Sequence, residues 1–455
     1  MKENLEHKLK NRHIQMIALG GIIGTGFFLG SAQGIKYTGS SLVLVYLLGG
    51  FIMYCIMRIL GEMTVYSPNS GSFVDYAYRF LGKAWGFIIG WNSWVIFTLS
   101  CMLEATAVAY LLDYWFIVPH WLTCLVVILL LTAINLLSVK HFAELEFWFA
   151  GIKIVFIIGI ILVGIYLICF DQAIHSNMMA NFKIYLVPTK NFHNGALGFI
   201  KALSISCFSL CGAEFVSVAA GEASNPKKSI PRAINGVFTK IVFFYIATIA
   251  IILLIYPYHH INYQVSPFIE VFARLGFKYS AIMINIVAIT ATLSALNSII
   301  YVSSRFLYKL ALNSQAPSFI LKTSQYKSPV IATLVTAGIT LLAVLANYLI
   351  SKELLLYLYQ IISIGILLNW VIIVITHFAF RQYIKNKQIA LDYTAFAFPW
   401  LNWILLIILA IIMIVVMSDL HNIYSFFLPL VWVLLLYICH LITSYNVDSK
   451  TTLNN

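Results

Sequence analysis

Charged residues are scarce in this chain. Only 10% of its 455 residues are Asp, Glu, Lys or Arg, whereas 61% are hydrophobic. This composition excludes a soluble domain, because so few polar side chains could not cover so much apolar surface, and it is typical of a protein that crosses a membrane many times. Lys and Arg outnumber Asp and Glu by 28 to 16. In a membrane protein this excess indicates basic cytoplasmic loops and not a nucleic acid partner.

Motifs of enzymes and of metal sites are also missing. The seven cysteines lie almost all inside or at the edges of apolar segments, and their spacing fits neither a zinc site nor a disulfide framework. The sequence has no phosphate-binding loop, which argues against direct ATP hydrolysis, and no catalytic cluster. The polar, basic start and the lack of a cleavage site after a short apolar run argue against a signal peptide. We therefore expect neither an enzyme nor a bound metal or cofactor.

Long apolar runs are what the sequence has in abundance. A membrane-spanning helix needs about 20 mostly apolar residues, and twelve segments reach about this length. They run approximately 14–37, 41–66, 84–112, 121–138, 146–169, 196–223, 235–257, 279–304, 329–350, 354–379, 399–417 and 424–444. When the N-terminus is placed inside, most Lys and Arg residues fall in the tails and inner connections, for example Arg79, Lys140 and Lys227. This asymmetry predicts that both termini are cytoplasmic.

The first apolar segment contains a glycine-rich stretch from Gly20 to Gly30, which reads GGIIGTGFFLG. Each glycine costs roughly 1 kcal/mol in a helix interior, and a membrane-spanning helix leaves backbone groups unpaired only where they face protein or a water-filled cavity. We expect the helix to break at Gly24-Thr25-Gly26 and to line a site there. The free N–H groups of the second half-helix would suit an anion such as a carboxylate. The alternative is that these glycines only allow close helix packing.

A second break is expected in segment six, at Ser209 to Gly212 within the sequence CFSLCGAE. Interrupted helices at corresponding positions of two halves are the best sequence signal for a transporter site at the middle of the membrane, and segments one and six are five apart. The second break therefore favours a binding site over simple packing at the first. No residue-level repeat relates the halves, so the inverted symmetry rests on the order of the helices.

Several stretches together resemble the amino acid permeases of the amino acid–polyamine–organocation superfamily, and in particular its bacterial amino acid transporter family. They are NRHIQMIALGGIIGTGFFLGS, RILGEMTVYSPNSGSFVDYA, GWNSW, CGAEFVSVAAGEASNPKKSIPRAI and LSALNSIIYVSSRFLYKLALNSQAP, and they cover the first ten helices. The stretch AAGEASNPKKSIPRAI is most similar to lysine permeases and fungal permeases.

The resemblance implies an all-α integral membrane protein with a LeuT-like fold, in which 12 transmembrane helices form one domain. Two repeats of five helices would be related by inversion, helices one and six would be broken, and two further helices would follow. The parts would be a cytoplasmic tail (1–13), a first repeat (14–169), a second repeat (196–379), the two extra helices (399–444) and a second cytoplasmic tail (445–455).

The resemblance also implies uptake of an amino acid and assigns residues to the substrate. The carboxylate of the substrate would bind the backbone of the first break, and its amino group would meet backbone carbonyls beside both breaks. Phe208 would in addition occupy the position of an aromatic gate. The implied substrate-binding residues are Ile23, Gly24, Thr25, Gly26, Phe208, Ser209 and Gly212.

Three ionisable residues lie deep in apolar segments, where a charge is costly and indicates function by default. Lys153 must pair with an anion or lose its proton. The resemblance places it where sodium-coupled relatives hold a cation, so its protonation would couple transport to protons. The alternative is a lysine that snorkels to the inner end of its helix. The resemblance places Glu104 beside the substrate cavity, where it would be a substrate partner or proton carrier, with a protonated structural carboxyl as the alternative. Glu214 follows the second break, and we expect it to stabilise that break or to gate the pathway.

Polar residues of two further helices have expected partners. Ser294 and Asn297 in segment eight are expected to face Lys153, which adds Ser294 to the proton-coupling residues, with polar helix packing as the alternative. Arg58 and Glu62 are four residues apart near the inner end of segment two. This spacing predicts an ion pair along one helix.

We predict a secondary active transporter of the cytoplasmic (inner) membrane that imports an L-amino acid by proton symport and alternating access. An amino acid exchanger and a transport-inactive nutrient sensor of the same fold are the alternatives. The fixed charge of Lys153 argues against sodium symport, because it would repel sodium at the cation site. The expected partners are a small amino acid and the lipid bilayer. Cationic, neutral and aromatic amino acids all stay open as substrates, because transporters of these classes share most of the motifs.

Overall fold

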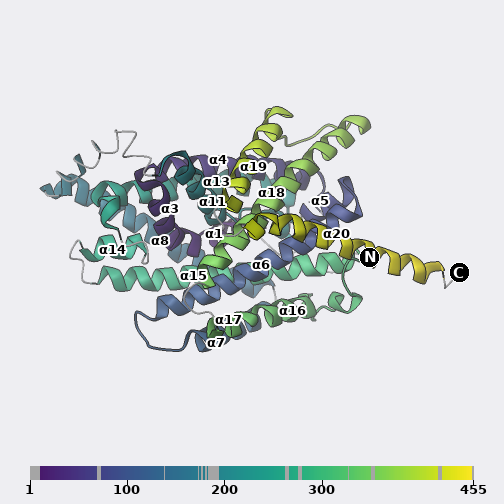
Figure 1. Ribbon diagram of the computed structural model, residues 1–455, viewed down its shortest axis with the longest axis horizontal. Coiled ribbons are helices and arrows are strands. Elements are labelled where there is room, and N and C mark those ends of the chain that lie inside the picture. Colours follow the sequence, from purple (N-terminus) through teal and green to yellow (C-terminus); the bar gives the residue numbers. More distant parts are fainter. Residues whose placement is uncertain are drawn as a thin grey trace.

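The computed structural model is all-helical over the residues that it describes (Figure 1). These are residues 11–68, 73–137, 139–172, 174–175, 178–179, 182, 194–261, 266–274, 279–325, 327–349, 354–418 and 423–452. Most of the connection between predicted segments five and six (170–195), and residues Asn69, Ser70 and Gly71 between segments two and three, lie outside this part of the chain.

The α-helices follow the predicted apolar segments closely. Their bounds are α1 (Asn11–Ile22), α2 (Thr25–Phe28), α3 (Gly30–Thr38), α4 (Leu42–Tyr66), α5 (Phe73–Phe80), α6 (Lys83–Leu112), α7 (His120–Leu136), α8 (Val139–Phe170), α11 (Gly195–Ser209), α12 (Phe215–Ala219), α13 (Pro226–Ile255), α14 (Pro267–Arg274), α15 (Ser280–Leu312), α16 (Val330–Thr340), α17 (Leu342–Leu349), α18 (Leu354–Lys387), α19 (Trp400–Ser418) and α20 (Ile423–Thr452).

Within the described residues, seven helical stretches are long and apolar enough to cross a membrane, and four shorter apolar helices accompany them. One of the seven, Thr25–Tyr66, joins the second half of predicted segment one to segment two. An all-α membrane fold agrees with this arrangement, whereas the number of twelve spans and the inverted repeat stay predictions.

Both predicted breaks are present in the helices. α1 ends at Ile22 and α2 begins at Thr25, so the first break comprises Ile23 and Gly24, whereas Thr25 and Gly26 of the predicted break already belong to α2. α11 ends at Ser209 and α12 begins at Phe215, so the second break comprises residues 210–214 and starts one residue after the predicted Ser209. Gly212 has a φ of +106°, a backbone conformation that glycine adopts readily and other residues rarely do. The local sequence thus explains why each helix stops where it does.

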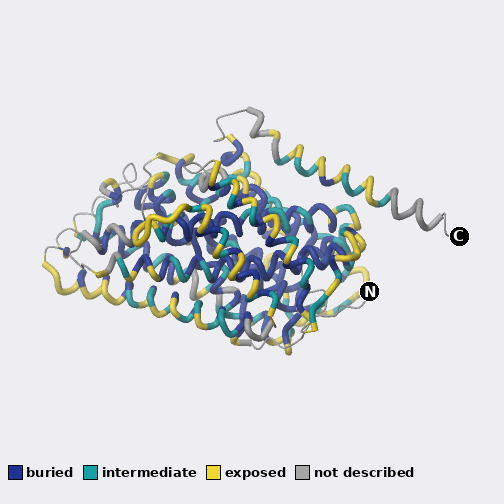
Figure 2. The backbone as a smooth tube through the Cα atoms, turned by 90° about the horizontal axis from the view of Figure 1, so that it is seen from below, coloured by how far each residue is buried: buried dark blue, intermediate teal, exposed yellow. Residues whose placement is uncertain are grey.

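The first break lies inside the bundle. α6 and α15 pack side by side through its middle, and α1 packs against α8, α13 and α15 (Figure 1). In the view of Figure 2 the inner helices are buried. α20 packs against α6, where the ring N–H of Trp432 donates to the side-chain oxygen of Asn92 at 3.0 Å. The outer face of α8 exposes apolar side chains, among them Val155, Leu162 and Tyr166. An apolar surface of this kind fits contact with lipid.

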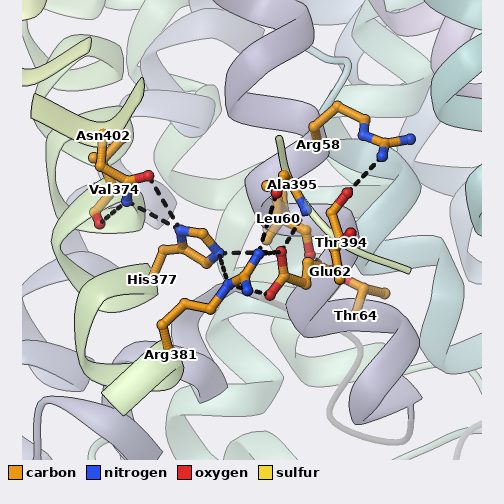
Figure 3. A network of polar contacts seen from close by, with 10 residues as sticks. All are labelled: Arg58, Leu60, Glu62, Thr64, Val374, His377, Arg381, Thr394, Ala395 and Asn402. Atoms are coloured by element: carbon orange, nitrogen blue, oxygen red, sulfur yellow. Dashed lines mark hydrogen bonds and ion pairs between the residues drawn. The ribbon is translucent and has the colours of Figure 1, made fainter. Parts of the chain in front are cut away.

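A buried ion pair ties α4 to α18 (Figure 3). The carboxylate of Glu62 is fully buried. One of its oxygens accepts a hydrogen bond from Nη2 of Arg381 at 2.8 Å, and the other lies 2.6 Å from Nε of the same guanidinium in an ion pair. The backbone N–H of Ala395 donates to the same carboxylate at 2.5 Å, and the Nε2 of His377 lies 3.3 Å from it. The pair therefore also holds the segment that leads from α18 to α19.

The predicted ion pair between Arg58 and Glu62 is wrong. Arg58 donates to the backbone carbonyl of Thr394 at 2.5 Å, and its guanidinium lies 4.1 Å from the centre of the Tyr393 ring (Figure 3). The carboxylate of Glu62 instead meets both arms of a guanidinium on α18. A charge-assisted hydrogen bond in a buried site is stronger than a contact between exposed neighbours on one helix.

Candidate functional site

The two broken helices meet at their breaks. The hydroxyl of Ser209 donates to the backbone carbonyl of Gly26 at 2.7 Å. The hydroxyl of Tyr245, on α13, lies 3.1 Å from the Ile22 carbonyl and 3.0 Å from the Ser209 carbonyl. These carbonyls end α1 and α11, where the next helical N–H is missing. Tyr245 was not predicted, because no local pattern shows that a tyrosine on a third helix points at the breaks.

Glycine also allows the two breaks to approach closely. A Cβ atom on Gly26 would lie 2.7 Å from the Cα of Ser209. A Cβ atom on Gly212 would lie 2.9 Å from the carbonyl oxygen of Gly21. Any larger residue at either position would push the two broken helices apart. The two interpretations of the glycines, as helix breakers and as packing residues, therefore both apply.

A pocket lies between the breaks and combines two kinds of group. The backbone of both breaks and the carboxyl group of Glu104 are polar, and much of the remaining wall consists of aromatic rings. The lining residues are Gly21, Ile22, Gly24, Gly26, Phe97, Ser100, Glu104, Phe208, Ser209, Cys211, Phe215 and Ile299. Gly24, Gly26, Glu104, Phe208 and Ser209 of the predicted substrate-binding set thus come together. Ile23 and Gly212 lie in the same two breaks, and Thr25 begins α2 directly after the first. Polar groups beside apolar rings suit a small ligand with a charged end and an apolar end.

Glu104 reaches from α6 to the first break. One of its carboxyl oxygens accepts a hydrogen bond from the Thr25 hydroxyl at 2.8 Å and lies 3.4 Å from the Thr25 backbone nitrogen. The other oxygen is buried and has no hydrogen-bond partner in the part of the chain that the structure describes. A buried polar atom without a partner is costly. Since Glu104 lines the pocket, this oxygen can accept a hydrogen bond from a ligand.

Lys153 is fully buried on α8. Its Nζ donates to the backbone carbonyls of Gly20 at 2.7 Å and Ile23 at 2.8 Å. Full burial excludes a lysine that snorkels to the helix end. The ammonium group instead lies where carbonyls at the end of α1 converge, as a small cation would.

Ser294 and Asn297 contact a carboxylate that the sequence analysis did not single out. The Ser294 hydroxyl donates to one oxygen of Glu146 at 2.5 Å, and the Asn297 side-chain amide lies 3.4 Å from the other. Glu146 is fully buried. It could have been found from its spacing, since Glu146 and Lys153 are seven residues apart and therefore on the same face of a helix.

Glu214 folds back onto the second break. Its carboxylate accepts hydrogen bonds from the Gly212 backbone N–H at 3.1 Å and from the Cys211 thiol at 3.3 Å. The carboxylate thus supplies a partner for a backbone N–H group at the break. The Phe208 carbonyl, expected to meet a substrate amino group, already accepts the Cys211 N–H at 3.0 Å. It keeps a second lone pair for a ligand.

Aromatic rings flank the pocket on two sides. On the side toward which α3 leads, the Phe208 ring meets the Tyr359 ring with centroids 4.8 Å apart. On the side at which α1 begins, Phe97 packs against Phe215 at 5.3 Å and stacks on Phe306 at 5.5 Å. Ring contacts thus flank the pocket between the two breaks.

Ion pairs reinforce the closure on the side at which α1 begins. The Nε of Arg305 donates to Glu222 at 2.8 Å, and both side chains are almost fully buried. The guanidinium of Arg305 also lies 3.6 Å from the centre of the Tyr301 ring. Lys309 at the end of α15 pairs with Asp75 of α5 at 3.0 Å. Opening the pocket to this side would require these contacts to separate.

Comparison with known proteins relates the whole chain to transporters. The family model described as Amino acid permease matches residues 13–450. The chain is 38% identical over 441 residues to the aromatic amino acid transport protein AroP of Escherichia coli (strain K12), and 38% identical over 442 residues to AroP of Salmonella typhi. It is 36% identical over 440 residues to the uncharacterized transporter YdgF of Bacillus subtilis (strain 168). Each comparison covers 96% of both chains.

Proposed function

The chain belongs to the amino acid permease family, and we propose that it imports an aromatic amino acid together with a proton. The predicted family is thereby confirmed, as is the prediction of a transporter and not an enzyme. The AroP relatives are named for aromatic amino acids, whereas the stretch 219–234 resembles lysine permeases. The pocket supports the aromatic class.

The lining of the pocket between the breaks carries this proposal. The first break suits the substrate carboxylate, because backbone N–H groups open the next half-helix there. The partnerless oxygen of Glu104 suits the ammonium group as a charge-assisted acceptor. Phe97 and Phe215 offer ring surfaces to an aromatic side chain. A lysine side chain would need a second carboxylate, and Glu104 is the one acidic residue among the lining residues that the structure describes.

Lys153 is the proposed site of proton coupling. When it is protonated, its ammonium holds the carbonyls of Gly20 and Ile23, as a bound cation would. Loss of the proton removes the charge and weakens this attraction, which frees the end of α1 to tilt. Rocking of the broken helices against the rest of the bundle would then expose the pocket to each side in turn.

Uptake into proteoliposomes tests this proposal. The vesicles receive an inward proton gradient without sodium and a panel of labelled phenylalanine, tyrosine, tryptophan and lysine. We expect the aromatic amino acids to accumulate, an uncoupler to abolish accumulation, and Lys153→Ala to lose it. Lys227→Ala is the matched control, because the Lys227 side chain is 64% exposed and lies 3.8 Å from Asp392; this variant should retain accumulation.

Three other results would overturn parts of the proposal. Rapid exchange against preloaded amino acid without uphill uptake would identify an exchanger and leave Lys153 with a structural role. Accumulation of lysine alone would refute the aromatic substrate. Binding of an amino acid without any flux would favour a nutrient sensor.

A further inference from the structure

Glu146 is a buried carboxylate that the transport cycle described above does not use. It lies on α8, its side chain is fully buried, and its two oxygens meet Ser294 at 2.5 Å and Asn297 at 3.4 Å. The side-chain oxygen of Asn297 in turn accepts a hydrogen bond from the Asn135 amide at 2.8 Å. Polar groups from α7, α8 and α15 thus form one buried network. A buried carboxylate inside a membrane protein indicates a role in moving ions or protons.

Gly20 of α1 brings Glu146 and Lys153 together. An oxygen of Glu146 occupies the space of the missing side chain, since a Cβ atom on Gly20 would lie 1.8 Å from it. The carbonyl of the same Gly20 accepts the hydrogen bond from Lys153 at 2.7 Å. Both ionisable side chains therefore contact one residue of α1. A tilt of α1 would break both contacts at once.

Glu146 also lies nearer than Lys153 to the side at which α1 begins. Seven residues separate them along α8, which is a rise of about 10 Å. Close to Glu146 the helix reaches the surface, where the half-exposed Glu144 pairs with Arg12 at 2.6 Å. This is the side predicted to be cytoplasmic.

We propose that Glu146 accepts the proton of Lys153 and releases it on the side at which α1 begins. The inference rests on the proposed proton coupling at Lys153. It adds the group that takes the proton from Lys153 and then releases it once α1 has tilted and water reaches the network. Ser294 and Asn297 stabilise the carboxylate form, which is the form that must receive the proton.

The proton balance is simple. An N–H bond of the Lys153 ammonium breaks and an O–H bond forms on Glu146, so that a cation and an anion become a neutral amine and a neutral acid. The O–H bond of Glu146 then breaks to water, and the carboxylate returns. The first step leaves the summed charge of Lys153 and Glu146 at zero. Moving α1 past a neutral pair avoids the cost of exposing an unpaired charge to an apolar interior.

Other charged groups near this network have partners of their own. On α1 and α8, Arg12 and His13 face Glu144. On α15, Arg305 pairs with Glu222 beside Tyr301. On α6, Glu104 bonds Thr25, and on α13 the Tyr245 hydroxyl faces backbone carbonyls. Glu146 is thus the carboxylate that shares a contact residue with Lys153.

The variant Glu146→Gln separates proton release from a structural role. Glutamine keeps the shape and can still accept a hydrogen bond from Ser294, but it cannot take up a proton. We expect net uptake driven by a proton gradient to fall at least about tenfold, whereas exchange of labelled for unlabelled amino acid stays within about twofold, because exchange needs no proton release. Glu144→Gln, two residues away and half-exposed, should leave both rates unchanged.

The outcomes are distinct. A folded Glu146→Gln protein that loses exchange and net uptake equally would show a structural role, and one that keeps full net uptake would show that protons leave by another route. Wild-type protein without proton-driven uptake would instead refute the proposed function, and the inference with it. If Glu146→Gln does not fold, Ser294→Ala provides the test. Without the Ser294 hydroxyl, Glu146 should hold its proton more tightly. Net uptake should then require a more alkaline vesicle lumen, whereas exchange should be unaffected. An unchanged dependence of net uptake on lumenal pH would overturn the inference.

Discussion

Removing one partner of the buried ion pair on α4 and α18 should destabilise the whole bundle. Glu62→Gln keeps the size of the side chain but leaves Arg381 without its anion. Breaking a fully buried pair in this way costs about 3–5 kcal/mol. Glu62 is fully buried and Arg381 is 21% exposed, so water can partly solvate the remaining guanidinium. We therefore expect a loss of about 2–4 kcal/mol.

Thermal unfolding of the detergent-solubilised protein, followed by tryptophan fluorescence, measures this loss. The unfolding entropy of a chain of 455 residues is about 1 kcal/mol per degree, which converts the expected loss to a melting midpoint lower by about 2–4 °C. Arg381→Met should lower the midpoint similarly. The double variant should lose less than the sum of the two single variants, with a coupling of about 1–3 kcal/mol.

An exposed pair provides the control for this cycle. Lys227 and Asp392 lie 3.8 Å apart with side chains 64% and 81% exposed. Lys227→Gln should therefore change the stability by less than about 1 kcal/mol. If Glu62→Gln behaves like this control, or if the two buried variants are strictly additive, the ion pair does not hold α4 to α18.

Three further variants test contacts around the breaks. Gly20→Ala should lower the melting midpoint, because its Cβ would lie 1.8 Å from a Glu146 oxygen; a wild-type midpoint would mean that this carboxylate can move aside freely. Tyr245→Phe removes the hydroxyl between the terminal carbonyls of α1 and α11 and should cost about 1–2 kcal/mol in the same assay, whereas no change would show that the tyrosine only packs there. Glu222→Gln should lower the midpoint further than Glu62→Gln, since Arg305 is only 6% exposed and a buried guanidinium without its anion is costly; an equal or smaller shift would argue against a firm closure on that side.

The local sequence was sufficient to predict that the chain is a membrane protein and that two of its helices are broken. Hydropathy over about 20 residues reports whether a helix can cross a bilayer, and glycine weakens a helix wherever it occurs. Both are properties of a short stretch, so Gly24 and Gly212 could be recognised without knowledge of their neighbours. The same holds for a lysine in an apolar segment, which must find partners wherever the helix packs.

The tertiary structure alone decided which side chains meet. Glu62 pairs with a residue 319 positions away and not with Arg58 on its own helix. Tyr245 reaches both breaks from α13, and Glu146 meets Ser294 across 148 positions. Contacts of this kind depend on the rotation and depth at which separate helices pack, and hydropathy carries no record of either. The sequence by itself therefore determined where the helices run and where two of them break, and the packing of the bundle decided which groups surround the breaks and how their charges are matched.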